Sequence, residues 1–309
     1  MLGAVLATIL FSCSAVSGRQ LVKWLPCTEV NFWRLTLAAL MLGLWSHTLG
    51  GGLGGGALAL FLVSGAVGFG FGDIALFQTY PRLGTRLTMM MVNCLAAPVA
   101  ALAEWLWLGN RLSAAEAVCG VAILGGVGVA LAPGENPHLD RRTLWIGIAF
   151  GMLAALGQGL GAVLSRKAYA VAEAARLPVD GITAAYQRIL GGLLVTGLFL
   201  LLLRRKKVFE QKNLTVPLAT PSPAMSERWR VAGPWLAFNA LVGPTLGVSC
   251  YQWALLTKGT GVVLPIVAIT PLTVIPFAVW MGEERPSRRA LAGGVVAVAG
   301  AVALVLVSR

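Results

Sequence analysis

Apolar runs of about twenty residues alternate with short polar segments along almost the whole chain. A helix that crosses the hydrocarbon core of a bilayer needs roughly 20 predominantly apolar residues, because that core is about 30 Å thick. Runs of suitable length, bounded by charged residues, proline or glycine, predict ten membrane-spanning helices at 2–18, 28–48, 57–80, 86–108, 113–132, 143–165, 181–203, 233–256, 260–281 and 287–307. The pattern predicts an all-α integral membrane protein.

Three segments of the first half of the chain match segments of the second half. The matches join 96–120 to 269–293, 32–42 to 186–196, and 14–19 to 161–166. They place Pro98 over Pro271, Gly109 over Gly282, Gly120 over Gly293, and Arg34 over Arg188. The ten predicted helices therefore form two five-helix repeats. Because five is odd, the second repeat runs through the membrane inverted relative to the first, as in many transporters.

The repeats predict the domain organisation. The first repeat covers residues 1–132, a linker covers 133–142, and the second repeat covers 143–309. Within the second repeat, residues 204–230 are basic and contain three prolines, so they are predicted to form a solvent loop.

Composition supports a membrane protein and excludes several other classes. Hydrophobic residues make up 57% of the chain and charged residues only 12%, with a net charge of +12. Most basic residues lie between apolar runs, which favours contact with lipid headgroups, and no basic face is interleaved with aromatic residues as in a nucleic-acid-binding protein. The expected partners are the lipid bilayer and a small-molecule substrate, and a homodimer is left open.

Cysteine and histidine usage gives no basis for a metal site or cofactor. The five cysteines are scattered without CxxC spacing, and the two histidines, His47 and His138, lie in predicted loops. No nucleophile and base pattern is recognisable, so the sequence predicts no catalytic residues and no enzyme.

Several of these features together resemble a known family. They are the Phe32-Trp33-Arg34 start of the second helix, a proline followed eleven residues later by glycine at the ends of the fourth and ninth, and the triplets Leu108-Gly109-Asn110 and Met281-Gly282-Glu283. The chain resembles the EamA-type ten-helix branch of the drug/metabolite transporter superfamily, with Asn110 where that family usually has glutamate. The resemblance implies a secondary carrier of the plasma (inner) membrane, typically an exporter, with a cavity lined by helices one, three, four, six, eight and nine.

The stretch GFGFGDIALFQ, residues 68–78, places Asp73 inside an apolar run. A carboxylate at that depth is costly and by default suggests function. Three roles remain open: carrying a coupling proton, binding an amine of the substrate, or pairing with an arginine. When Gly84 is set over Gly259, Gly72 falls over Gly247 and Asp73 falls over Val248. The second half therefore has no equivalent carboxylate, which favours a functional role.

Further polar residues within the runs are candidates for the substrate or proton site. Tyr251, Gln252 and Gln158 can offer neutral hydrogen bonds to a ligand or join helices to one another. Arg34 and Arg188 can be structural, recognise a substrate carboxylate, or pair with Asp73. Pro98 and Pro271 are candidate hinges for alternating access, because proline removes an internal hydrogen bond.

The sequence therefore predicts a transporter that exports a small polar or amphipathic metabolite, amino acid-like, or a drug, with proton coupling as one option. A flippase for a lipid-linked head group and a non-transporting scaffold are the alternatives. Lys and Arg are concentrated after odd-numbered predicted helices, which favours both termini outside the cytoplasm, whereas the family resemblance implies termini inside.

Overall fold

The computed structural model describes residues 2–108, 113–131, 140–212, 225–258, 260–282 and 287–307. Its helices are α1 (Leu2–Leu21), α2 (Cys27–Thr48), α3 (Leu58–Gly65), η1 (Ala66–Gly72), α4 (Asp73–Leu108), α5 (Ala114–Leu131), α6 (Arg141–Ala174), α7 (Gly181–Lys212), α8 (Met225–Ala240), η2 (Leu241–Gly247), α9 (Val248–Lys258), α10 (Thr260–Val267), α11 (Thr270–Trp280) and α12 (Arg288–Val307), of which η1 and η2 are π-helical. The motif residues Gly109, Asn110 and Glu283 lie outside the described residues.

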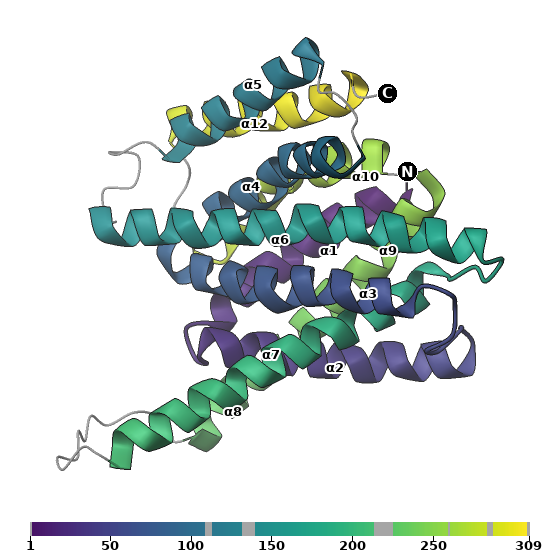
Figure 1. The fold of residues 1–309 in the computed structure, drawn as a ribbon. Coiled ribbons are helices and arrows are strands. Elements are labelled where there is room, and N and C mark those ends of the chain that lie inside the picture. Colours follow the sequence, from purple (N-terminus) through teal and green to yellow (C-terminus); the bar gives the residue numbers. More distant parts are fainter. Residues whose placement is uncertain are drawn as a thin grey trace.

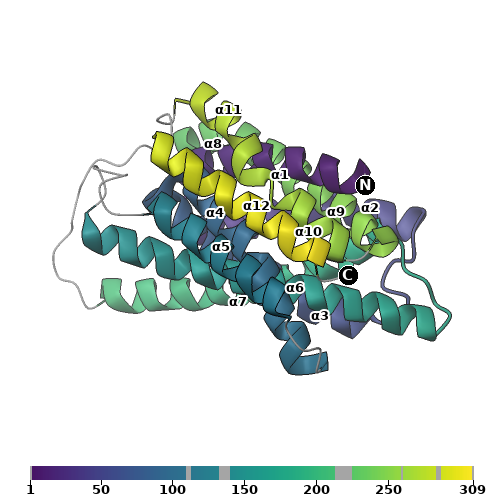
Figure 2. The ribbon, with the colours of Figure 1, turned by 90° about the horizontal axis from the view of Figure 1, so that it is seen from above.

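The helices run side by side as one bundle, with the N- and C-terminal ends at the same side (Figures 1 and 2). Five stretches are long and apolar enough to cross a membrane: Leu2–Leu21, Leu58–Ala100, Arg141–Ala174, Gly181–Arg205 and Ser226–Thr257. Many large apolar side chains point outward, including Leu44, Val121 and Trp280, as expected where lipid replaces water. The predicted all-helical membrane class is confirmed at this level.

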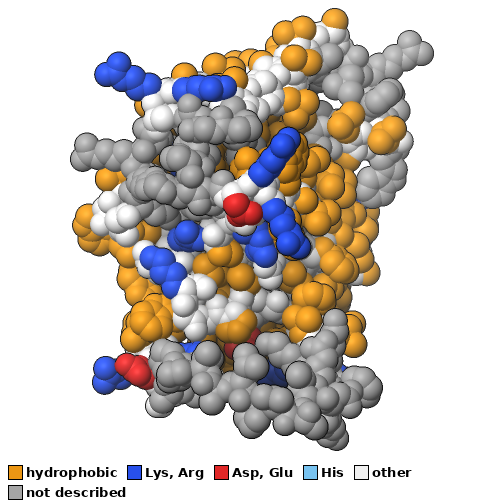
Figure 3. Space-filling model, turned by 90° about the vertical axis from the view of Figure 1, so that its left-hand side faces the viewer, with side chains coloured by type: hydrophobic (Ala, Val, Ile, Leu, Met, Phe, Trp, Pro, Cys, Tyr) orange, Lys and Arg blue, Asp and Glu red, His pale blue; other side chains and the backbone are white. Residues whose placement is uncertain are grey.

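The bundle end opposite the termini is polar. Figure 3 looks onto that end and shows Lys and Arg side chains gathered among uncharged and undescribed atoms, with hydrophobic side chains towards the flanks. α1 carries Arg19 in its last turn, and α6 begins at Arg141. Charge is thus held at an end of the helices, where membrane headgroups and water can solvate it.

Gly84 turns the chain back on itself within α4. Its φ of 73° is a conformation that only glycine adopts readily. Ala75 and Val92, which lie on either side of it, pack in the same buried cluster with Ala154. In a straight helix, at 1.5 Å per residue, these alanine and valine positions would be about 25 Å apart. The predicted runs 57–80 and 86–108 are therefore two antiparallel segments joined at one glycine.

The two candidate hinge prolines have different surroundings. Pro271 stands at the start of α11, directly after the break that separates α10 from α11. Pro98 lies inside α4, where Gly84 is the residue with non-helical backbone angles. A hinge requires a break in the helical backbone, and of these two prolines only Pro271 lies beside one.

Residues 204–230 differ from the predicted solvent loop. α7 continues to Lys212 and α8 begins at Met225, so both described ends of this segment are helical. The residues after Leu203 are mainly Arg, Lys, Glu and Gln, which are good helix formers, so the helix continues beyond its apolar part. Pro217, Pro221 and Pro223 lie outside the described residues.

Small residues allow the closest helix contacts, as the packing of α5 against α12 shows (Figures 1 and 2). A Cβ atom built on Gly126 would lie 2.5 Å from the backbone nitrogen of Ala297 and 2.6 Å from the carbonyl oxygen of Gly293. Only glycine permits this close approach. In lipid, where the hydrophobic effect does not drive helices together, such close packing stabilises their association.

Candidate functional site

A cavity of about 740 Å³, including its opening, lies at the centre of the bundle. Residues of α1, α2, η1, α4, α6, α7, η2 and α9 line it: Phe11, Ser14, Ala15, Arg34, Gly68, Phe69, Gly72, Asp73, Leu76, Tyr80, Met89, Val92, Asn93, Ala154, Gln158, Arg188, Gly243, Pro244, Val248 and Tyr251. Both halves of the chain contribute, and apolar side chains surround a few polar groups. Ligand sites commonly have this character.

The lining corrects the expected set of helices. Predicted helices one, three, four, six and eight contribute as expected, but no described residue of the ninth lies on the cavity. Helices two and seven, which were not expected, contribute Arg34 and Arg188. Both arginines are long enough to reach headgroups, yet each points inward and is at most 5% exposed. Neither arginine therefore places its guanidinium at the lipid headgroups.

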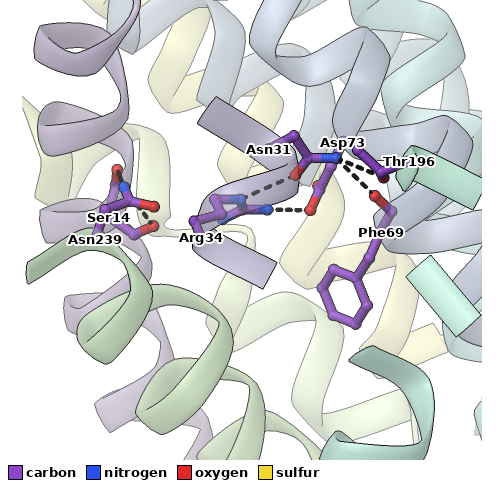
Figure 4. A network of polar contacts seen from close by, with 7 residues as sticks. All are labelled: Ser14, Asn31, Arg34, Phe69, Asp73, Thr196 and Asn239. Carbon is purple, nitrogen blue, oxygen red and sulfur yellow. Dashed lines mark hydrogen bonds and ion pairs between the residues drawn. The ribbon is translucent and has the colours of Figure 1, made fainter. Parts of the chain in front are cut away.

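Arg34 is held by a network that joins α2 to both halves of the chain (Figure 4). Its guanidinium donates to the Asp73 carboxylate, forming a buried ion pair, and its Nε donates to Asn31 Oδ1 at 3.0 Å. Asn31 Nδ2 donates to the Phe69 carbonyl at 3.0 Å and to Thr196 Oγ1 at 3.2 Å. The guanidinium also stacks on the Phe77 ring at 4.8 Å. Among the three proposed roles of Asp73, this geometry favours pairing with an arginine.

Arg188 occupies a comparable place on α7 without a comparable partner. Asp180 fixes the start of α7, because its Oδ1 accepts hydrogen bonds from the Ile182 and Thr183 amides, both at 2.9 Å. The Arg188 guanidinium stacks on the Phe69 ring at 4.8 Å, and the residue is 3% exposed. It forms no hydrogen bond or ion pair with another described residue, and its Nε is buried without a partner.

The two π-helices present matching glycines to the two arginines. They end at Gly72 and Gly247, which the repeat alignment pairs with each other. A Cβ built on Gly68 of η1 would lie 3.2 Å from Arg188 Nη2, and one built on Gly243 of η2 would lie 3.5 Å from Arg34 Nη1. Gly68 and Gly243 have the same 175-residue spacing as Gly72 and Gly247. π-helical turns often occur at functional sites, and these two lie on the cavity.

The other predicted site residues are only partly brought together. Tyr251 and Gln158 line the cavity, and the buried Tyr251 hydroxyl has no hydrogen-bond partner among the described residues. Gln158 forms no hydrogen bond with a described residue. Gln252 is fully buried but does not line the cavity, and both polar atoms of its side chain lack described partners. The described residues contain no group of three or more His, Cys, Asp or Glu side chains placed to hold a metal.

Sequence reasoning missed two asparagines that hold lining residues of the cavity in place. Asn31 orients Arg34, and Asn239 of α8 donates to the Ser14 carbonyl at 2.7 Å (Figure 4). Asn239 also donates to Ser17 Oγ at 2.8 Å. The available signal was helical spacing, since Asn31 precedes Arg34 by one turn. Asn239 offers no such signal, because its partners lie more than 200 residues away.

Comparison with known proteins agrees with this architecture. A solved structure, described as "Crystal structure of protein", is similar over 100% of this chain and 96% of its own, with a TM-score of 0.61 and 16% sequence identity, which shows a shared fold. No protein with a curated description matches the sequence. The model of the EamA-like transporter family matches residues 1–132 and 145–306, almost the whole chain. The chain therefore belongs to the EamA-like transporter family of multi-pass membrane transporters.

Proposed function

We propose that this protein is a secondary active transporter that exports a small polar or amphipathic metabolite across the plasma (inner) membrane by alternating access. The observation that carries the proposal is the central cavity, which is lined by both halves of the chain and contains buried charged groups within an apolar wall. A charge held inside a membrane protein is costly, so such groups by default indicate a functional site.

Alternating access is supported by the two-part organisation. The family model matches the chain in two consecutive parts, and each part supplies one π-helix and one arginine to the cavity. Two similar halves that share a central site can rock against each other, so that the site opens first to one side and then to the other. The break beside Pro271 is a candidate hinge for such motion.

The lining also indicates the cargo and its coupling. Phe11, Leu76 and Met89 provide apolar contact, whereas Gln158 has free hydrogen-bonding capacity, so an amphipathic molecule fits better than a fully apolar one. Asp73 is the one carboxylate among the described lining residues. If protons drive export, Asp73 is therefore the residue that carries the proton.

Gln158→Leu is expected to reduce export without unfolding the protein, because Gln158 has no described partner to lose. A lost hydrogen bond to the cargo costs about 1 kcal/mol, so release of the cargo is expected to fall about fivefold. Intracellular and extracellular metabolites are compared in cells that express wild type, Gln158→Leu, Asp73→Asn or no transporter, at matched protein levels. Cargo is defined as compounds released with wild type but not with the empty vector.

The matched control is Gln78→Leu, a glutamine of α4 that bonds Arg82 and does not line the cavity. Its release is expected to equal that of wild type. Equal release by wild type and the empty vector would refute the transporter proposal. Equal release by wild type and Gln158→Leu would show that the cargo does not bind Gln158 in this cavity.

A further inference from the structure

The cavity contains one arginine that is neutralised and one that is not. Arg34 and Arg188 are paired by the repeat alignment, and each lies against the matching glycine of a π-helix. The residue directly after η1 is Asp73, which pairs with Arg34. The residue directly after η2 is Val248, which lies on the cavity and carries no charge. The position equivalent to Asp73 is therefore apolar, and Val248 packs in the same cluster as Phe69, the ring on which Arg188 stacks.

This asymmetry leaves the cavity with a positive charge. Its described lining holds two arginines and one aspartate, which sum to +1. A buried arginine normally has an anionic partner, because removing an unpaired charge from water is far more costly than removing a paired one. The Asp73 carboxylate pairs with Arg34 and forms no hydrogen bond or ion pair with Arg188 in the described part of the chain, so the hydrogen-bonding capacity of Arg188 is not filled.

Two hydrogen-bond donors that line the cavity lack partners among the described residues. Tyr251 is three residues after Val248 on α9, hence about one helical turn away, and both residues line the cavity. The Tyr251 hydroxyl and the Arg188 Nε are both buried and without a partner among the described residues, and each residue is 3% exposed. A phenolic O–H beside a guanidinium is a donor set for a carboxylate or phosphate group.

We propose that the cargo carries an acidic group, a carboxylate or a phosphate, that binds Arg188 and accepts a hydrogen bond from the Tyr251 hydroxyl. The bound group takes the place at Arg188 that Asp73 takes at Arg34, so that each arginine of the loaded cavity has an anionic partner. This inference rests on the proposed transport function and names its substrate class. A purely cationic cargo would instead add a second unpaired positive charge to the cavity.

Val248→Asp tests the inference by supplying the missing carboxylate from the protein itself. The new side chain is expected to pair with Arg188, raise the thermal unfolding midpoint of the purified, cargo-free protein, and lower release of acidic compounds about tenfold or more. Val242→Asp, which buries a carboxylate in η2 away from the cavity lining, is the matched control and is expected to lower the midpoint. Arg188→Gln is expected to abolish release of acidic compounds and to remove the stabilising effect of Val248→Asp.

The outcomes separate this inference from the transporter proposal. If wild type releases compounds that carry no acidic group, the inference is wrong and the transporter proposal stands. If wild type releases nothing beyond the vector control, the transporter proposal is wrong and the inference falls with it. The inference is also overturned if Val248→Asp lowers the midpoint as much as Val242→Asp does, or if Arg188→Gln releases acidic compounds at the wild-type rate.

Discussion

Asp73→Asn is expected to lower the free energy of unfolding by about 3–5 kcal/mol, the typical effect of removing one partner of a buried ion pair. The substitution leaves both arginines of the cavity buried without a carboxylate. Asn31 and the Phe77 ring would still hold the Arg34 guanidinium in place, so it would not escape to water. The measurement is unfolding of the purified protein by SDS in mixed micelles.

Two companion variants sharpen this prediction. Arg34→Gln is expected to lower the free energy of unfolding by less than Asp73→Asn does, because Asp73 and Arg188 then remain in the cavity with opposite charges. The double variant Arg34→Met with Asp73→Leu removes the pair as a unit, and replacing a buried pair with apolar residues is often neutral. If Asp73→Asn unfolded like wild type, Asp73 would not be a buried partner of Arg34.

Gly65→Ala is expected to lower the free energy of unfolding by about 3 kcal/mol, the upper end of the usual range for an overpacked core. A Cβ atom on Gly65 would overlap the backbone carbonyl of Arg188, and one on Gly191 would overlap the carbonyl of Leu62. α3 and α7 therefore meet backbone to backbone at two glycines. Rigid backbone cannot move aside as a flexible side chain does, so α7 must shift and carry Arg188 with it.

Gly128→Ala is the matched control, since a Cβ on this glycine of α5 meets no described atom within 4 Å. Here alanine is expected to stabilise the helix by about 0.5–1 kcal/mol, because glycine loses more conformational freedom on folding. Both variants are measured in the same SDS titration. Equal stabilities of the Gly65→Ala and Gly128→Ala proteins would show that α3 and α7 are not in direct backbone contact.

The sequence was sufficient to predict the helical membrane class and the family, because both depend on long apolar runs and repeated motifs. The repeat alignment also paired Gly72 with Gly247, and both glycines end π-helices. Pairing between Asp73 and an arginine was one of three options, since the sequence shows which groups are buried in the membrane but not their separation.

Other features could not be predicted because they depend on packing between distant segments. The boundary at Gly84 was predicted, because Pro81, Arg82 and Arg86 separate the runs 57–80 and 86–108, but the sequence did not show that a single non-helical residue makes the turn. Arg34 and Arg188 point inward and stack on the rings of Phe77 and Phe69, contacts that spacing along the chain does not reveal. The helical ends of residues 204–230 were obscured by their charge, which indicates solvent exposure but not backbone conformation.

The most direct test of the central claim is the accessibility of position 158 from both sides of the membrane. Gln158→Cys is placed in a chain whose five native cysteines are replaced by serine, and a membrane-impermeant thiol reagent is added to right-side-out or inside-out vesicles. Leu194→Cys, on the exposed surface of α7, is the control and is expected to react from neither side. Alternating access through this cavity predicts that the thiol introduced by Gln158→Cys reacts from both sides. Reaction from one side only, or from neither, would contradict it.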